Sequence, residues 1–344
     1  MEPRRRTPPL RLVTPGRLIA LGLILLVGVF ALWVYPSNEY IYLPDRAHPV
    51  APLVRVAGAR PAKNAAVIYF VDVIVRKATL LEQLFGGLHD GADLESPSAV
   101  SPPGVTDAQA REIGLREMKQ SQQIAAAVAL RAAGLKVVAK DTGALITDLV
   151  TGTPAVGKLE PTDVIVAIDG KRVPNLADVK ATMAAKHVGE PITFTVQRGA
   201  KRLNVHMATV SAGRGSKRAV VGVFLEQAEH IQLPIRVSID AGDVGGPSAG
   251  LAFALDVFEQ LGHNVDHGHK IAATGEIFLD GSVGPIGGIK QKTIGARETG
   301  VDAFLVPAGE NAQDARKYAG GLRIIPVKSF QQALRALATL PAKP

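Results

Sequence analysis

The chain has 344 residues, of which 47% are hydrophobic and 20% are charged, and this is enough for about two folded domains. It contains no cysteine, which excludes a thiol nucleophile, disulfides and a thiolate metal site. Residues 1–17 contain one acidic residue, Glu2, and five arginines, Arg4, Arg5, Arg6, Arg11 and Arg17. This segment therefore carries half of the formal net charge of +8. The remaining charge is too thinly spread to form a basic face, so we expect no nucleic-acid partner.

The first predicted element is an apolar helix over residues 18–35. This run contains no charged residue and is just long enough to cross a bilayer, and Trp33 and Tyr35 place aromatic rings at its far end. A cleaved signal peptide is the competing interpretation, but its core would be unusually long and no small-residue cleavage motif follows. A buried core helix fits less well, because the run is apolar on all sides. We therefore predict one retained transmembrane helix at the cell membrane, with residues 1–17 as a cytoplasmic tail and the later domains extracytoplasmic.

The segment after this helix changes character several times. Residues 36–61 contain several prolines and are predicted to be a tether. Residues 65–75 are rich in β-branched and aromatic residues and predict one or two strands. A polar, proline-rich loop follows at 92–107. Near its end, Thr106 caps a long helix that runs through Arg131.

Residues 137–210 have a pattern of their own. A short helix is expected at 176–186, and strands are expected at 144–150, 163–169, 191–198 and 203–209. This β-rich unit interrupts the surrounding alternation of strands and helices, so we predict a separate inserted domain.

One serine stands out in the segment Asp243-Val-Gly-Gly-Pro-Ser-Ala-Gly250. Apolar residues recur at helical spacing from Leu251 to Leu261, which places Ser248 at or next to a helix N-terminus. Unpaired backbone N–H groups and the positive end of the helix dipole suit an oxyanion there. Ser248 is therefore a candidate nucleophile, provided that a nearby group can take its proton.

The match to G-x-S-x-G also suggests the nucleophile elbow of an α/β-hydrolase. That mechanism needs an acid and then a histidine after the serine in chain order. The later histidines are His263, His267 and His269, which share one short polar segment and leave no room for the usual strands. The elbow interpretation is therefore disfavoured. Histidines in a polar loop are more often solvated than metal-bound, so we expect no metal.

A lysine base is available further along the chain. Asp280-Gly281 predicts a tight hairpin turn, and Gly287-Gly288 opens a helix that carries Lys290 and Lys292 in its first turn. Burial and the helix dipole both lower the pKa of a lysine, so a neutral amine could act as a base here. A Ser–Lys dyad is therefore chemically consistent.

The same helix start loosely matches a phosphate-binding loop, from Gly284 to Lys292-Thr293. Gln291 stands where that loop needs a glycine, and the chain contains no other G-x-x-x-x-G-K-[ST] motif. We therefore reject nucleotide binding and expect no cofactor and no ATPase unit.

These segments together resemble the proteolytic domain of Lon proteases. GPSAG, then TGEI, a glycine turn and P-I-G-G-I-K-x-K-x-x-x-A stand in the order found in that family. The resemblance implies that Ser248 is the nucleophile and that Lys292, rather than Lys290, is its base. It also implies that Thr274 lies near the lysine of the dyad, and we count it among the residues that support the site or its oxyanion, with Gly246, Pro247 and Ala249.

Two further points bear on this resemblance. The helix with Met118, Ser121 and Ala125 resembles one that lies early in Lon-type proteolytic domains. One departure is Val244-Gly245, where the family has a Lys-Asp pair whose acidic residue has been linked to switching the site on and off. The resemblance therefore does not carry such gating over to this chain.

Residues 137–210 resemble a PDZ domain of the bacterial protease-associated type. The signature is T-P-A, a leucine, D-x-I-x-x-I-D-G, a helix and then paired strands. The resemblance implies that an extended peptide pairs with a strand beside a helix groove. A terminal carboxylate would be held by backbone N–H groups at Thr142, Gly143, Ala144 and Leu145. The alternative is a stabilising insert without a ligand.

The expected fold is therefore α/β (α+β). Residues 62–136 and 211–340 would form a Lon-type proteolytic domain, with the PDZ domain inserted at 137–210. The expected protein is a membrane-anchored, ATP-independent serine endopeptidase that acts on polypeptides through an acyl-enzyme. The resemblance also implies a homo-oligomer, a hexamer by analogy. The alternative function is a catalytically silent, membrane-tethered PDZ adaptor.

Overall fold

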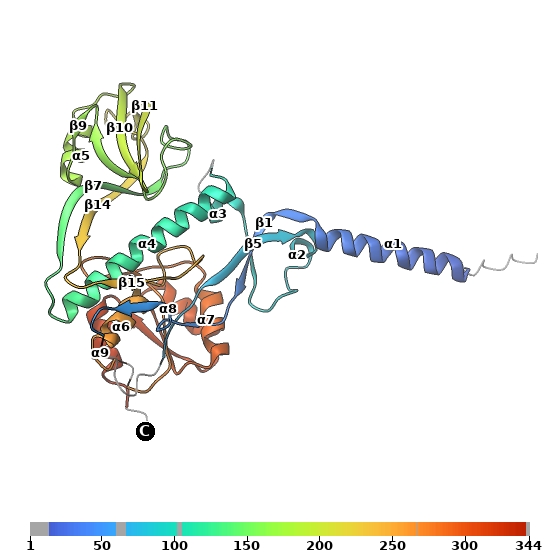
Figure 1. The fold of residues 1–344 in the computed structure, drawn as a ribbon. Coiled ribbons are helices and arrows are strands. Elements are labelled where there is room, and N and C mark those ends of the chain that lie inside the picture. Colours follow the sequence, from blue (N-terminus) through green and yellow to red (C-terminus); the bar gives the residue numbers. More distant parts are fainter. Residues whose placement is uncertain (1–13, 60–66, 102–104, 266, 342–344) are drawn as a thin grey trace, which may run out of the picture.

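The computed structural model describes residues 14–59, 67–101, 105–265 and 267–341. Most of the predicted cytoplasmic tail lies outside these residues. Helix α1 (Pro15–Val34) extends away from the rest of the molecule and buries none of its residues (Figure 1). It is long and apolar enough to cross a membrane, and a signal sequence near the N-terminus would meet the same criteria.

Residues 36–59 form strands rather than the predicted tether. β1 (Pro36–Pro44) pairs with β5 (Val73–Thr79) and β6 (Asp93–Glu95), and β3 (Val54–Val56) pairs with β15 (Val237–Ile239). Three of the prolines that suggested a tether, Pro36, Pro44 and Pro49, lie at the ends of β1 and of β2 (His48–Pro49), where the missing N–H group costs little. Two short helices complete this region, α2 (Leu80–Leu84) and α3 (Pro97–Val100).

The main sheet has the strand order β2-β4-β16-β19-β20. Its parallel strands are β4 (Ile68–Phe70), β16 (Ile271–Ala273), β19 (Ala303–Pro307) and β20 (Arg323–Val327). Both faces are covered, as parallel sheets require. Helices α4 (Asp107–Ala132), α6 (Gly250–Gln260) and α9 (Phe330–Leu337) contribute to the core on one face, and α7 (Ile289–Thr299) and α8 (Glu310–Tyr318) contribute to the core on the other.

The segments before and after the inserted unit share this core. Met118 and Ala125 of α4 are buried with residues of α6 and the main sheet. The two helices approach closely at Gly250, where an added Cβ would lie 2.6 Å from Ser121 Oγ. In the segments outside the inserted unit, the helices predicted after Thr106, Ser248 and Gly288 are confirmed as α4, α6 and α7, within a few residues at their ends.

The inserted unit is an antiparallel sheet with the order β11-β10-β8-β7-β14 and a core of its own. Its elements are β7 (Val138–Leu149), β8 (Val164–Ile168), β9 (Lys171–Arg172), α5 (Leu176–Ala184), β10 (Pro191–Arg198), β11 (Lys201–Ala208) and β14 (Val223–Gln232). A small pair, β12 (Val210–Ser211) and β13 (Ala219–Val220), precedes β14. Because β14 pairs with β7 along its length, the sheet continues past the predicted boundary at residue 210.

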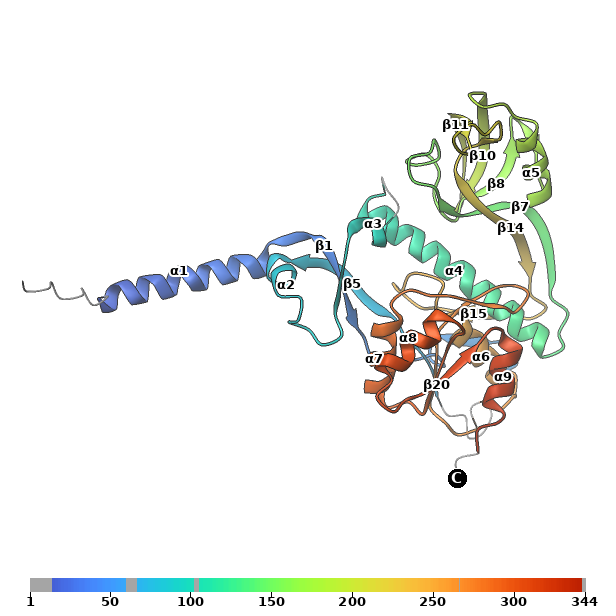
Figure 2. The same ribbon diagram turned by 180° about the vertical axis from the view of Figure 1, so that it is seen from behind.

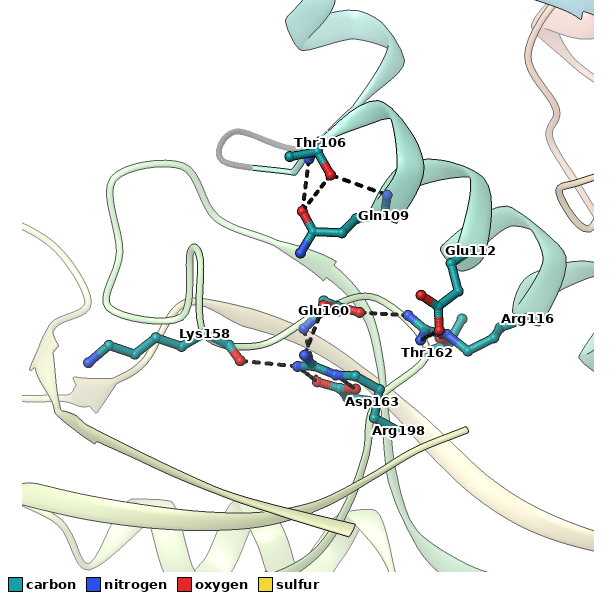
Figure 3. A network of polar contacts seen from close by, with 9 residues as sticks. All are labelled: Thr106, Gln109, Glu112, Arg116, Lys158, Glu160, Thr162, Asp163 and Arg198. Atoms are coloured by element: carbon teal, nitrogen blue, oxygen red, sulfur yellow. Dashed lines mark hydrogen bonds and ion pairs between the residues drawn. The ribbon is translucent and has the colours of Figure 1, made fainter. Parts of the chain in front are cut away.

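A polar network joins the inserted unit to α4 (Figure 3). Arg116 of α4 lies 2.7 Å from Glu160, and Glu160 also lies 2.8 Å from Arg198 of β10. Arg198 makes two further contacts, of 2.7 and 2.6 Å, with the fully buried Asp163. Figures 1 and 2 show α4 running between the β-rich unit and the main sheet.

Candidate active site

Ser248 lies in the turn that leads into α6. Ala249 caps this helix and Gly250 begins it, so the predicted position of Ser248 beside a helix N-terminus is confirmed. Ser248 O accepts hydrogen bonds from Gly275 N at 2.8 Å and from Thr274 Oγ1 at 3.2 Å. Ser121 Oγ donates to Pro247 O at 2.9 Å. The turn is therefore held from both the main sheet and α4.

Lys292 reaches the same turn from α7. The predicted hairpin is present as β17 (Glu276–Ile277) and β18 (Val283–Gly284), and α7 begins after Gly288, whose φ of 66° suits glycine. Lys292 is 5% exposed, and its Nζ donates to Ser248 Oγ at 2.8 Å. Lys290 points elsewhere, with Nζ 2.7 Å from Asp93 Oδ1. Of these two lysines, only Lys292 contacts the serine.

Burial changes the acid–base properties of Lys292. It lowers the pKa of the amine to about 8, against an opposing effect of the Asp72 charge. A lysine with this pKa is partly neutral near physiological pH, as a general base must be.

A cavity of about 580 Å³ opens over these two side chains. Its lining comes from the Ser248 turn, from β1 and β5, and from the loop before α7, and includes Tyr42, Asp72, Val73, Val75, Ile286 and Gly287. Asn311 fixes that loop by exchanging two hydrogen bonds of 2.9 Å with the backbone of Ile286. The site thus combines a hydroxyl, a buried amine and an adjoining space.

Gly245 lies where the resembled family has an acidic residue. An added Cβ at this position would lie 3.3 Å from the backbone of Gly114 in α4. A longer side chain would therefore have to displace α4 or turn out into the cavity. The preceding Asp243 is exposed, with its carboxylate 3.2 Å from Arg111.

Two known domains match the sequence. The model of the Lon protease (S16) C-terminal proteolytic domain matches residues 203–339, and that of the PDZ domain matches residues 132–209. The chain carries a PDZ domain and a Lon-type proteolytic domain. The expected α/β architecture with these two domains is thereby confirmed.

Individual relatives agree with this result. "Lon protease 2" of Bacillus subtilis is 38% identical over 112 residues, which are 33% of this chain and 19% of that protein. "Lon protease 2" of Thermus thermophilus is 41% identical over 86 residues, covering 25% of this chain and 11% of that protein. The chain thus spans less than a fifth of the length of these relatives. A PDZ domain of the SdrC-like protein Lmo2051 from Listeria monocytogenes is 19% identical with a TM-score of 0.23, over 24% of this chain and 87% of its own.

The residues predicted to support the site or its oxyanion differ from one another in their hydrogen bonds. Gly246 N–H donates to Gly114 O at 2.8 Å, so this group is not free for an oxyanion, and a supporting role of Gly246 stays a prediction. Pro247 has no N–H group, and Thr274 Oγ1 donates to Ser248 O. The N–H groups of Ser248 and Ala249 make no hydrogen bond to any residue that the structure describes.

The predicted peptide site of the PDZ domain also needs correction. Ala144 and Leu145 lie within β7, paired on one side with β8 and on the other with β14, and Gly143 also pairs with β14. Gly143 O accepts a hydrogen bond from Gln227 Nε2 at 3.1 Å, whereas Thr142 lies in a shift of the β14 register and borders two cavities. Because β14 already occupies this strand edge, no peptide can pair there.

The three clustered histidines are engaged away from the Lon-type site. The His263 ring stacks on Phe258 with centroids 4.0 Å apart, and His269 Nε2 lies 2.7 Å from Pro341 O. The backbone N–H of His267 donates to Asn264. These contacts give no support to an esterase triad.

A second cavity, of about 210 Å³, adjoins the Ser248 turn at Pro247 and Ser121. Glu117 of α4, Glu226 of β14 and Glu276 of β17 line it. Burial and these two neighbouring carboxylates raise the pKa of Glu276 to about 7. No sequence pattern indicates this cluster, because its members come from three separate elements.

Asp72 and His48 were also missed by the sequence analysis. Asp72 lines the cavity with Ser248 and Lys292, and His48 Nε2 lies 3.5 Å from Asp72 Oδ1. A signal existed for Asp72, since it is the one charged residue in the apolar run 65–75. Asp45, His48 and Asp72 have ligand-type atoms within 4.8 Å of one another, a spacing that their ion pairs explain.

Gly295 of α7 provides a stability test of this region. Glycine to alanine in a helix normally stabilises by up to ~1 kcal/mol, but a Cβ at Gly295 would lie 1.7 Å from Asp45 O. We expect Gly295→Ala to reduce the free energy of unfolding by about 1–3 kcal/mol, measured by chemical denaturation. Gly287→Ala is the matched control, because nothing lies within 4 Å of its added Cβ. Equal stability of the two variants would contradict the packing of α7 on this loop.

Proposed function

We propose that this chain is a membrane-anchored serine endopeptidase that cleaves polypeptides with a Ser248–Lys292 dyad. One observation carries the proposal: a buried lysine amine lies 2.8 Å from a serine hydroxyl at the start of a helix. The match to the Lon-type proteolytic domain supports the same chemistry.

The reaction would begin with neutral Lys292. Its amine takes the proton of Ser248 as Oγ attacks the scissile carbonyl carbon. Negative charge develops on the carbonyl oxygen, for which the N–H groups of Ser248 and Ala249 at the start of α6 are available. The Lys292 ammonium group then gives its proton to the leaving amine. Water, deprotonated by Lys292, hydrolyses the resulting ester and frees Ser248.

We further propose a location and an assembly. The apolar helix α1 would serve as a single-pass anchor in the cell membrane, with the arginine-rich tail in the cytoplasm and both domains outside it. No phosphate-binding loop occurs within these 344 residues, so cleavage would not depend on ATP. A ring of six subunits is the assembly that the resemblance implies, and the mass of the detergent-solubilised protein tests it.

The function is tested with a fluorophosphonate probe that labels nucleophilic serines. We expect the purified full chain to be labelled on Ser248, because its hydroxyl is hydrogen-bonded to a partly neutral amine and opens onto a cavity. Mass spectrometry identifies the labelled residue, and casein hydrolysis without ATP is measured in parallel.

The competing function is a membrane-tethered PDZ adaptor with a silent Lon-type domain. It predicts neither labelling nor casein hydrolysis at any pH between 6 and 10. That result, obtained with protein whose folding is verified by circular dichroism, would overturn the proposed protease.

A further inference from the structure

Asp72 lies close to the candidate dyad but on a different element. It follows β4 and precedes β5, and β4 pairs in parallel with β16, which leads directly into Thr274. Asp72 and Thr274 therefore both lie just beyond the carboxyl ends of two adjacent parallel strands, at the same edge of the main sheet. Asp72 borders the cavity that also contains Ser248 and Lys292.

The Asp72 carboxylate is only partly paired. Its Oδ1 atom is buried and has no hydrogen-bond partner among the residues that the structure describes. His48 Nε2 is 3.5 Å away, within ion-pair range but beyond a hydrogen bond, and is also 3.2 Å from Asp45 Oδ2. Leaving a buried carboxylate oxygen without a donor is unfavourable, so such an atom calls for an explanation.

The loop that leads into His48, the first residue of β2, is fixed against α7, the helix of Lys292. Ala47 N–H donates to Thr299 Oγ1 at 2.8 Å, and the backbone of Asp45 packs on Gly295. The ring of His48 also lies against Phe70 of β4, with centroids 5.4 Å apart. Lys292, Asp72 and His48 are therefore held in one rigid arrangement by α7, β4 and the loop between β1 and β2.

Charge–charge interactions link Lys292, Asp72 and His48. The charge of Asp72 raises the pKa of Lys292, and the charge of Lys292 lowers the pKa of Asp72. Burial has the largest effect on the Asp72 carboxyl and raises its pKa above the usual value, while His48 lowers this pKa and Asp45 raises it. The other ionisable groups bordering the cavity are Tyr42 of β1 and the exposed Asp243.

We propose that Asp72, backed by His48, is a positioning residue that acts through Lys292: from the same cavity, its negative charge stabilises the positive charge that Lys292 gains from Ser248. This inference rests on the proposed protease function. In the step concerned, the O–H bond of Ser248 breaks, an N–H bond forms on Lys292, and Oγ uses its electron pair to attack the carbonyl carbon. Asp72 neither gains nor loses a proton, and its negative charge offsets the new ammonium charge.

The inference is tested by the pH dependence of Asp72→Asn. Because Asp72 favours the charged form of Lys292, its removal makes the amine neutral at lower pH. We expect the midpoint of Ser248 labelling by the fluorophosphonate to move to lower pH. We also expect kcat for peptide hydrolysis at the high-pH plateau to fall by ~10-fold or more, with KM nearly unchanged, because the ammonium form is less well stabilised.

Three further variants keep the test decisive. His48→Gln removes a group that keeps Asp72 ionised, so it should move the midpoint in the same direction by a smaller amount, and it carries the test if Asp72→Asn does not fold. Asp314→Asn removes a charge paired with Lys317 on α8 and should leave the midpoint unchanged. Asp72→Glu should recover part of the plateau rate.

The outcomes separate this inference from the function on which it rests. If the unaltered chain is labelled and active but Asp72→Asn and His48→Gln keep its midpoint and plateau rate, the role of Asp72 is overturned and the protease stands. If the unaltered chain is neither labelled nor active, the proposed function itself fails, and the inference fails with it.

Discussion

Replacing Ser248 with alanine is expected to abolish peptide hydrolysis, by ~10⁴-fold or more in kcat, because among the described residues Ser248 has the one hydroxyl that is hydrogen-bonded to Lys292 Nζ. The measurement is the initial rate of casein and peptide cleavage by the detergent-solubilised full chain. The substitution removes a single oxygen atom from a half-buried side chain, so the melting temperature should change little.

The matched control is Ser282→Ala. Ser282 lies in the hairpin turn, where its hydroxyl contacts Asp280, and it is not part of the cavity over Lys292. We expect this variant to keep its activity. Hydrolysis by Ser248→Ala at the rate of the unaltered chain would exclude Ser248 as the nucleophile.

Replacing Lys292 with methionine is expected to reduce kcat by ~10³-fold or more, since the serine loses the one base that is hydrogen-bonded to its hydroxyl in the part of the chain that the structure describes. In the unaltered chain the base must be neutral, so the rate should rise with pH around a midpoint near the Lys292 pKa of about 8. The measurement is kcat/KM for a peptide substrate between pH 6 and 10. A rate that is independent of pH across this range would contradict a lysine base.

Stability measurements separate this loss of activity from unfolding. Burial depresses the Lys292 pKa in the folded state, so its contribution to stability is present above the unfolded pKa and is lost as pH falls through about 8. Methionine carries no charge and escapes this loss. Lys292→Met should therefore melt at a higher temperature than the unaltered chain at pH 6, with a smaller difference at pH 10. A variant that is less stable at pH 6 would contradict the buried-charge interpretation.

The elements around the site could be read from the sequence because their signals are local. The apolar spacing after Ser248 predicted α6, and the Asp280-Gly281 turn and the glycines before Lys292 predicted the hairpin and the start of α7. The segment 36–59 was misjudged as a tether. Its prolines suggested irregular structure, whereas its pairing depends on β5, β6 and β15, which lie far away in sequence.

The PDZ groove shows the same limit. The order of strands and the D-x-I-x-x-I-D-G motif identified the domain, but the occupant of the β7 edge is β14, which begins 13 residues beyond the predicted boundary at 210. Strand pairing between distant segments leaves no local mark, so only the folded chain shows that this edge is closed.

The sequence by itself determined the domains and the two candidate reactive side chains, because glycine turns, helix starts and the family's motifs are properties of short segments. Tertiary structure decided the rest. It placed Lys292 rather than Lys290 at 2.8 Å from Ser248 and buried its amine. It also brought Asp72 into the same cavity and His48 to 3.5 Å from Asp72, both from segments more than 200 residues before Lys292. Distance, burial and electrostatic neighbours arise only when remote elements pack together, and these three quantities set the pKa of the candidate base.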